Sequence, residues 1–170
     1  MTPQLAVVVR AADAERRRDF ASAVRDEQRR LYVAALAILH DAAEAEDAVQ
    51  DTWMQAWRRW DSLRQQDRRA QWLMTICVRR CFRQRSRLRR WLLERPQSPA
   101  PDATSFAASS LDLHRAQEKL SPQQRAAVFL TYHHGYTVDE CAHLMGVAPG
   151  TARSHLARAL TTLRKEMRDD

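Results

Sequence analysis

The three glycines of this 170-residue chain all lie near its C-terminal end, and they constrain its fold more than any other feature. They are Gly135, Gly146 and Gly150. Glycine readily adopts the left-handed backbone that ends many helices. Gly146 therefore predicts the end of a helix that begins after Thr137, because Thr137 and Glu140 have the spacing of a capping box. Pro149 fits the first turn of the next helix, where a missing N–H costs no hydrogen bond.

Two short helices joined by a glycine turn are typical of a helix-turn-helix, whose second helix lies in a DNA groove. An isolated amphipathic helix with solvated arginines would be an ordinary surface helix, but the capped partner helix favours DNA binding. The spacing of apolar residues predicts a buried stripe on the second helix: Ala152, Leu156, Leu160, Leu163 and Met167. Its opposite face carries side chains that can donate to base edges and phosphates: Arg153, Ser154, His155 and Arg158.

The formal net charge of +7 is concentrated in one stretch. Residues 61–95 hold eleven arginines against three acids, and residues 71–94 have the pattern of a long helix. Like charges on one helix repel one another unless a polyanion neutralises them. Nucleic acid is the expected polyanion, because each neutralised phosphate releases counterions. An anionic membrane surface is the alternative, although the apolar face of this helix resembles a protein core.

The N-terminal part of the chain predicts two further helices. Residues 1–12 have no clear period and are expected to form a loose tail, after which a helix runs from Glu15 to about His40. A second helix begins at or just after Asp41, a residue type that caps helix N-termini. An aromatic stripe that includes Trp53 and Trp57 is expected to face the core.

The first turns of that second helix carry five acids and no basic residue: Asp41, Glu44, Glu46, Asp47 and Asp51. The helix dipole favours carboxylates at an N-terminus by about 0.3–1 kcal/mol each, which accounts for two or three of them. Because the rest of the protein is strongly basic, we interpret the full set as an interface for a positively charged protein.

The segment 96–110 contains three prolines among small polar residues and predicts a flexible linker. It divides an N-terminal domain, residues 13–95, from a C-terminal domain, residues 111–170. In the latter, a helix is expected over 111–120, and Ser121-Pro122 with Gln124 opens another that runs to about His133. The predicted fold is all-α, with two helical domains joined by a flexible linker and a helix-turn-helix in the second.

Three cysteines, an odd number, argue against a disulfide scaffold and favour a reducing cytoplasm. The spacing of Cys77 and Cys81, and of Cys141 and His143, matches no closed zinc site, so we expect buried thiols, no metal and no cofactor. The apolar run at residues 5–9 is too short to span a membrane. No motif for catalysis is present, so we expect no enzyme.

Three stretches together resemble the extracytoplasmic-function (ECF) group of bacterial RNA polymerase sigma factors. They are AEDAVQDTWMQAW at 45–57, WLMTICVRR at 72–80 and YTVDECAHLMGVAPGTARSHLARALTTLRK at 136–165. The resemblance implies an alternative sigma factor, not itself an enzyme, that binds core RNA polymerase and directs it to promoters with particular minus-thirty-five and minus-ten elements. Promoter DNA is then the second partner, and regulation by an anti-sigma factor is common in this group.

The resemblance also implies a role for particular positions. Those matching the polymerase-binding surface are Glu46, Asp47, Gln50 and Asp51. Those matching the minus-ten surface, which holds an unstacked base, are Leu63, Arg64, Gln65, Gln66, Asp67, Arg68, Arg79, Arg80 and Arg83. Those matching the minus-thirty-five surface are Thr151, Arg153, Ser154, His155 and Arg158.

The sequence departs from the usual pattern of the group at several of these positions. Members of the group usually have Asn at the position of Arg79 and often Asp at the position of Arg83. Gln65 stands where Gly is common, and Ala148 stands where a capping Ser is usual.

Two other classes of function remain as alternatives. A helix-turn-helix regulator would dimerise and bind duplex operators without polymerase, and a metal-dependent or redox enzyme would use the cysteines.

Overall fold

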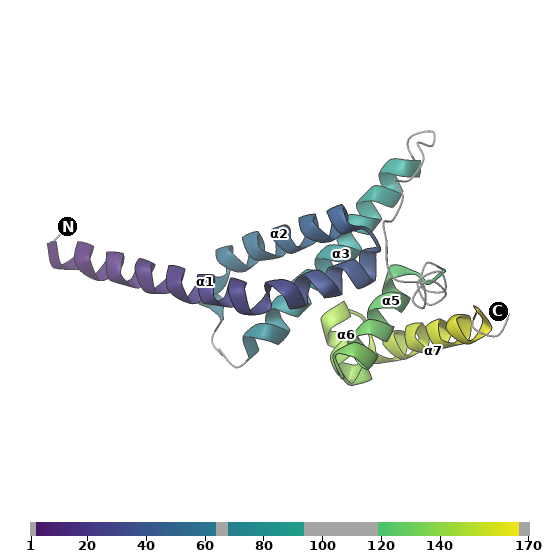
Figure 1. Cartoon of the computed structure of the whole chain (residues 1–170). Helices are drawn as coiled ribbons and strands as arrows, with labels where there is room; N and C mark the ends of the chain where they lie inside the picture. The colour runs from purple at the N-terminus through teal and green to yellow at the C-terminus, as the bar shows by residue number, and fades with distance from the viewer. Residues whose placement is uncertain (1–2, 64–67, 94–118, 167–170) are drawn as a thin grey trace.

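The fold, taken from a computed structural model, consists of helices packed in two units. The structure describes residues 3–63, 68–93 and 119–166, with side chains over 13–63, 68–85 and 119–166. The N-terminal unit contains α1 (Pro3–Leu39), α2 (Ala42–Arg58), a 3₁₀ turn (Trp60–Ser62) and α3 (Arg69–Leu93). The C-terminal unit contains α5 (Pro122–Val128), a π-helical turn (Phe129–His133), α6 (Val138–Met145) and α7 (Pro149–Glu166). The all-α prediction is confirmed (Figure 1).

Helix α1 is longer than its sequence pattern indicated. The loose tail expected over residues 1–12 is wrong for residues 3–12, because α1 already begins at Pro3. Proline suits the first turn of a helix, and no other proline and no glycine follows before Leu39. Nothing in the sequence therefore breaks the helix. Its first turns extend beyond the other helices (Figure 1), and contacts with α2 begin near Arg16.

A sharp reversal joins α1 to α2. His40 has a left-handed φ of 57° and donates its N–H to Leu36 O at 2.8 Å, which ends α1. Asp41 then caps α2, since its carboxylate accepts a hydrogen bond from Glu44 N at 2.8 Å. This confirms the predicted helix start, and the short turn makes α2 run back along α1 (Figure 1).

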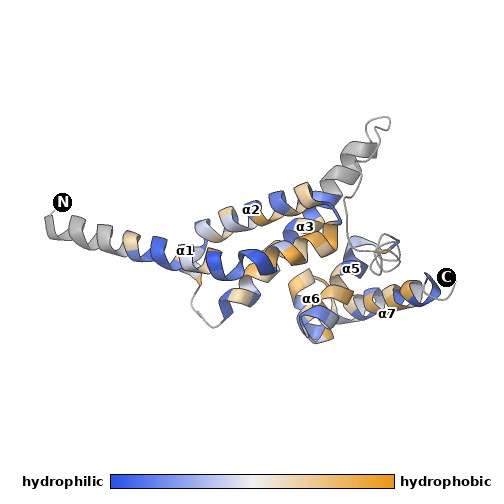
Figure 2. Ribbon diagram, in the orientation of Figure 1, coloured by the Kyte–Doolittle hydropathy of each residue, from blue (hydrophilic) through white to orange (hydrophobic). Residues whose placement is uncertain are grey.

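One hydrophobic core extends through both units. Buried side chains from the last turns of α1 meet those of α2 and α3, and buried residues of α5 and α6 join the same cluster. Figure 2 shows α1 changing from hydrophilic to hydrophobic toward the end that faces α5 and α6. Cys77, Cys81 and Cys141 are buried and free, as expected. The cluster places α6 against α3, and α5 against α1.

Three predicted boundaries of the C-terminal unit are confirmed, but the helix expected to run to about His133 is α-helical only to Val128 and continues as a π-helical turn to His133. Residues 119–120, at the end of the helix expected over 111–120, form a turn and a bend. Capping boxes form at Ser121 with Gln124 and at Thr137 with Glu140, and Gly146 ends α6 with a φ of 70°. Pro149 is the first residue of α7. The expected linker at 96–110 and most of the helix expected at 111–120 lie outside the described residues.

Candidate functional site

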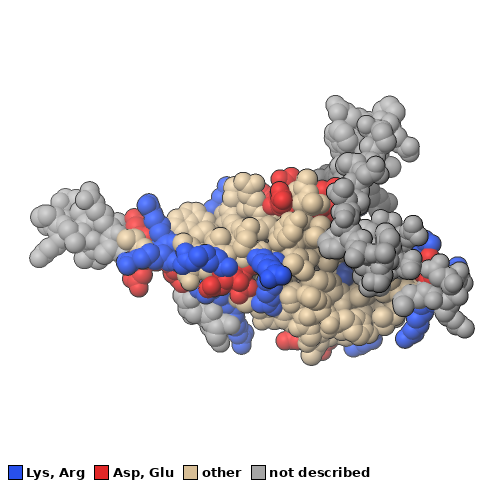
Figure 3. Space-filling model, in the orientation of Figure 1, with Lys and Arg blue, Asp and Glu red and all other residues tan. Residues whose placement is uncertain are grey.

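The candidate polymerase-binding face on α2 is partly exposed and partly paired. Glu46, Asp47 and Gln50 are exposed to solvent, and acidic side chains gather over α2 in Figure 3. Asp51 is less exposed because its carboxylate lies 3.3 Å from the Arg80 guanidinium of α3. At one end of this surface the carboxylates of Glu46 and Asp47 are exposed, and at the other end the carboxylate of Asp51 is neutralised by Arg80.

A second carboxylate of α2 is turned toward α3. Glu44 lies 3.4 Å from Arg85 Nη1, and Gln84 Nε2 donates to Glu44 O at 3.2 Å. Burial raises the pKa of the Glu44 carboxyl, and the nearby Arg85 opposes that shift. Two of the five acids, Glu44 and Asp51, thus pair with arginines of α3, although the sequence analysis interpreted the full set as an interface for a basic partner. Arg80 and Arg85 were missed because they lie about thirty to forty residues further along the chain.

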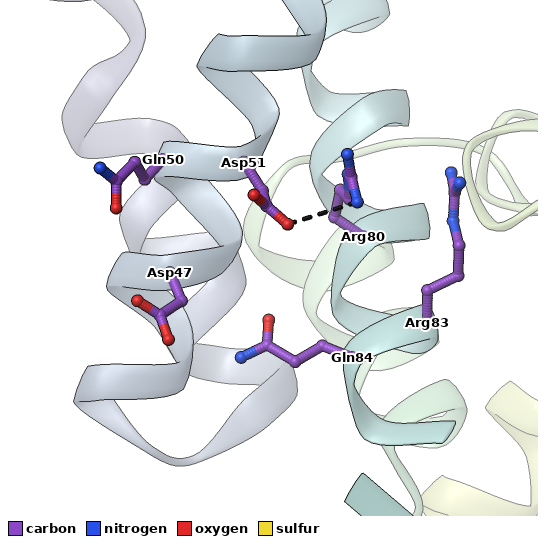
Figure 4. A pocket seen from close by; sticks show the side chains of 6 residues that line it. All are labelled: Asp47, Gln50, Asp51, Arg80, Arg83 and Gln84. Atoms are coloured by element: carbon purple, nitrogen blue, oxygen red, sulfur yellow. Dashed lines mark ion pairs between the residues drawn. The ribbon is translucent and has the colours of Figure 1, made fainter. Parts of the chain in front are cut away.

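A hollow lies between the two helices. Its walls carry carboxylates and amides from α2 and guanidinium groups from α3 (Figure 4). A basic side chain of a partner could enter from the α2 side, where unpaired oxygens are available, while an anion would meet the α3 side. The residues that line it are Asp47, Gln50, Asp51, Arg80, Arg83 and Gln84.

Most of the described arginines of α3 already have partners within the protein. Arg80 and Arg85 pair with carboxylates of α2, and Arg79 donates to two carbonyl oxygens of α6. The expectation that these charges need a polyanion is therefore wrong for Arg80 and Arg85, whose charges are neutralised by carboxylates, whereas the partners of Arg79 are neutral carbonyls. Arg83 is exposed, and its Nε donates to Arg79 O at 3.3 Å.

The candidate minus-ten residues are not all brought together. Leu63 ends the 3₁₀ turn half-buried, Arg68 is exposed, and residues 64–67 lie outside the described part. Arg79 lies eleven residues beyond Arg68, or about 16 Å along the helix axis at 1.5 Å per residue. The described residues thus form two groups, one just before α3 begins and one near the middle of α3.

Asp19 of α1 holds both ends of the segment that contains the candidate loop. Its Oδ2 accepts a hydrogen bond from Trp60 Nε1 at 3.0 Å, and its Oδ1 accepts one from Arg69 Nη1 at 3.0 Å. Phe20 adds edge contacts to Trp60, with ring centroids 4.8 Å apart. The sequence analysis missed this anchor, because no local signal links Asp19 to residues more than forty positions away.

The candidate minus-thirty-five face lies on the first turns of α7. Thr151, Arg153, Ser154 and Arg158 are exposed, and Ser154 Oγ donates to Gly150 O at 2.9 Å. His155 is half-buried, and both its burial and the neighbouring Arg158 lower its pKa. A neutral imidazole there can accept as well as donate a hydrogen bond.

The stripe of apolar residues predicted to be buried on the opposite face of α7 is confirmed for its first two members. Ala152 is 1% exposed and Leu156 packs against the core. Ala159, which the predicted stripe omitted, is fully buried. Met167 lies outside the described residues.

The described residues offer neither a metal site nor a membrane-spanning helix. No three His, Cys, Asp or Glu side chains within 13–63, 68–85 and 119–166 come together in a way that could hold a metal ion. Over the ranges that the structure describes, no helix has both the length and the apolarity needed to cross a membrane.

Comparison with known proteins gives matches for both units. Residues 23–91 match the family described as Sigma-70 region 2, and residues 110–163 match Sigma-70, region 4. The chain is 32% identical over 145 residues to the ECF RNA polymerase sigma factor SigM of Mycobacterium tuberculosis, covering 82% of this chain and 72% of that relative. It is 30% identical over 147 residues to SigL of the same organism, covering 82% and 83%.

Solved structures agree with these matches. The sigma factor RpoE from Bartonella quintana, in complex with the anti-sigma factor NepR, has a TM-score of 0.71 at 28% identity and covers 89% of this chain and 98% of its own. CnrH in complex with the cytosolic domain of CnrY has a TM-score of 0.63 at 23% identity, covering 91% and 90%, which is a likeness of fold alone.

Proposed function

We propose three separate binding surfaces for this chain, which belongs to the extracytoplasmic-function (ECF) group of RNA polymerase sigma factors. It is an alternative sigma factor that directs core RNA polymerase to promoters for transcription initiation. The α2 face of Glu46, Asp47, Gln50 and Asp51 binds core polymerase. Residues of α3 and the segment before it bind the minus-ten element, and the first turns of α7 bind the minus-thirty-five element.

The exposed acids of α2 carry the polymerase assignment. In a protein of net charge +7, the free carboxylates of Glu46 and Asp47 form a local patch of opposite sign. Complementary charge steers association and fixes the register of an interface. A basic surface on the polymerase is therefore the partner that this patch fits.

The exposed donors of α7 support the minus-thirty-five assignment. Arg153 and Arg158 project from the first turns of a helix that follows a glycine turn, the part that reaches base edges in helix-turn-helix proteins. For the minus-ten element, Arg68 and Arg83 are assigned residues whose side chains are exposed, one before α3 and one further along it, and they suit phosphate contacts.

Co-purification with core RNA polymerase at moderate salt tests the polymerase assignment. We expect wild type to be retained and the Asp47→Lys, Asp51→Lys variant to be lost, because two repulsive charges then face a basic partner. A variant with Asp13→Lys and Glu15→Lys makes the same charge change at exposed acids of α1 and should be retained. Equal retention of both variants would contradict the assignment of the α2 face.

The regulator alternative is not favoured, because it leaves the acidic face of α2 without a function. It would be supported if wild type were not retained by polymerase and instead formed a dimer that binds operator DNA alone.

We further propose that the chain acts in the cytoplasm, where the polymerase is. The polymerase carries out the chemistry, so this chain is no enzyme. An anti-sigma factor was solved with RpoE, and a partner of that class is proposed here too.

A further inference from the structure

Helix α1 holds residues on both sides of the segment that joins α2 to α3. Asp19 accepts hydrogen bonds from Trp60 Nε1, in the 3₁₀ turn after α2, and from Arg69 Nη1, at the start of α3, each at 3.0 Å. Leu63 and Arg68, which are assigned to the minus-ten element, lie between these two residues in the chain. Because one carboxylate holds Trp60 and Arg69 together, it restricts the places that Leu63 and Arg68 can take.

Arg16, about one turn earlier on α1, holds the same region from the side of α2. Its Nη2 donates to Trp57 O, in the last turn of α2, at 2.8 Å, and its Nε lies 3.0 Å from Asp61 Oδ1. Its guanidinium carbon lies 4.2 Å from the centroid of the Trp57 ring, within the range of a cation–π contact. The end of α2 and the 3₁₀ turn are thus both fixed against α1.

Aromatic packing supports these polar contacts. Phe20 makes edge contacts with three rings, whose centroids lie 5.6 Å away in Trp53, 5.0 Å in Trp57 and 4.8 Å in Trp60. Trp60 makes a further edge contact with Trp72 of α3, at 6.2 Å. Aromatic pairs favour this edge-to-face arrangement. Packing therefore brings the three helices together, and the hydrogen bonds of Asp19 add a fixed direction.

The Asp19 carboxylate is unsuited to a DNA contact of its own. Both of its oxygens accept hydrogen bonds within the protein, and its negative charge would repel phosphates. Its partner Arg69 also lies 3.9 Å from Asp26, whereas the adjacent Arg68 is exposed. The two neighbouring arginines therefore differ in their tasks, since Arg69 holds the start of α3 and Arg68 faces solvent.

We propose that Asp19 is a positioning residue for recognition of the minus-ten element. It acts through Trp60 and Arg69. These two residues fix the places of Leu63 and Arg68 close to them in the chain, and the inference rests on the proposed function, which assigns both to that element. An unstacked base needs a pocket of fixed shape, because small displacements of the contacting groups weaken recognition. Asp19 fixes these groups before DNA arrives, so that less ordering is needed on binding.

Binding of single-stranded minus-ten oligonucleotides to the holoenzyme, formed from core RNA polymerase and the full chain, tests this role. Selection from a random pool supplies the preferred oligonucleotide, and single-base changes supply its competitors. Asp19→Asn keeps the shape of the side chain but removes its charge and one acceptor. We expect it to weaken binding of the preferred oligonucleotide about tenfold, as one mismatched base pair would. The competitors should bind nearly as before, so discrimination falls as well.

Two comparisons separate positioning from stability. A lower stability reduces the folded fraction and weakens every binding step equally, whereas a loss of positioning leaves retention by core polymerase and binding of the minus-thirty-five duplex unchanged. Asp26→Asn removes the same charge from the same helix, beside the same Arg69, and should keep full discrimination. Unchanged discrimination in folded Asp19→Asn, or an equal loss in Asp26→Asn, would overturn the proposal.

Trp60→Phe gives a second test, which also decides the question if Asp19→Asn fails to fold. Phenylalanine keeps an aromatic ring beside Phe20 but lacks the N–H that Asp19 accepts. Trp60 is only 6% exposed, so a direct contact with DNA does not account for a loss. We expect discrimination to fall, and the variant with both changes to lose less than the sum of the two. Full discrimination in Trp60→Phe, or fully additive losses, would overturn the route through Trp60.

Failure of the proposed function would give a different pattern. If the wild-type holoenzyme bound all minus-ten oligonucleotides equally, the assignment of Leu63 and Arg68 would be wrong, and the role of Asp19 would fall with it. If wild type discriminated and Asp19→Asn did so equally, the assignment would stand and only the positioning role would be wrong.

Discussion

Asp51 and Arg80 form an ion pair of 3.3 Å that joins the candidate polymerase-binding face to the candidate DNA-binding helix (Figure 4). The Asp51 side chain is 43% exposed and that of Arg80 is 21% exposed. Ion pairs at such exposure contribute about 0.2–1 kcal/mol. A basic group of the polymerase could therefore replace Arg80 as the partner of Asp51 at little energetic cost.

Replacing Asp51 or Arg80 should change binding to core polymerase while leaving the free energy of unfolding nearly unchanged. We expect Asp51→Asn and Arg80→Gln each to change the free energy of unfolding by less than ~1 kcal/mol, because the pair is solvent-accessible. Retention by core polymerase without DNA should fall for Asp51→Asn and rise for Arg80→Gln, which frees the Asp51 carboxylate. Chemical denaturation and co-purification measure the two effects. A change of retention in the same direction for both variants would contradict competition for Asp51.

Asp19→Asn should destabilise the N-terminal unit. The Asp19 carboxylate accepts from both Trp60 and Arg69, and hydrogen bonds to a charged group contribute about 1.5–3 kcal/mol. We expect a loss of about 1–3 kcal/mol in the free energy of unfolding. Asp26, 3.9 Å from Arg69 and 58% exposed, gives the control: Asp26→Asn should change stability by less than ~0.5 kcal/mol. Equal losses would show that Asp19 is not the anchor.

Local sequence signals were sufficient for most helix boundaries. Asp41, Ser121 and Thr137 cap the helices that their spacing predicted, because a cap involves residues three positions apart. The beginning of α1 was missed, since the apolar run after Pro3 has no clear helical period, yet nothing in it breaks a helix.

The sequence indicated which residues belong to the candidate sites, but it did not indicate which of them contact one another. Asp51 and Arg80 were assigned to different surfaces, and their pairing depends on the packing of α2 on α3. The contact of Arg79 with His143 O joins residues 64 positions apart and requires the two units to dock. Neither relationship leaves a periodic or local trace in the sequence.

His134 should make stability depend on pH. Burial, followed by the nearby Arg30 and His133, lowers the pKa of His134 to about 4. The unfolded chain, with an ordinary pKa near 6.5, takes up this proton first. The free energy of unfolding should therefore be highest above pH 6.5 and fall as the pH drops toward about 4.

Chemical denaturation from pH 7.5 to 4.5 measures that slope. Because carboxylates begin to titrate at the lower end, the effect of His134 is the difference between wild type and His134→Gln. We expect the variant to lose part of the slope, and His143→Gln, at an exposed histidine of α6, to keep it. Identical slopes for wild type and His134→Gln would contradict the depressed pKa.

Arg158→Ala should weaken binding to the preferred minus-thirty-five duplex by about 1–3 kcal/mol and reduce discrimination against substituted base pairs. The reason is that Arg158 is exposed in the first half of α7, together with Arg153 and Ser154, and the proposed function assigns these residues to the minus-thirty-five element. Arg164→Ala removes an exposed arginine from the last turn of the same helix and should leave discrimination unchanged. Fluorescence anisotropy with matched and substituted duplexes measures both quantities. An equal loss on every duplex after Arg158→Ala would place this side chain on phosphate rather than on a base, since phosphate contacts carry no sequence information.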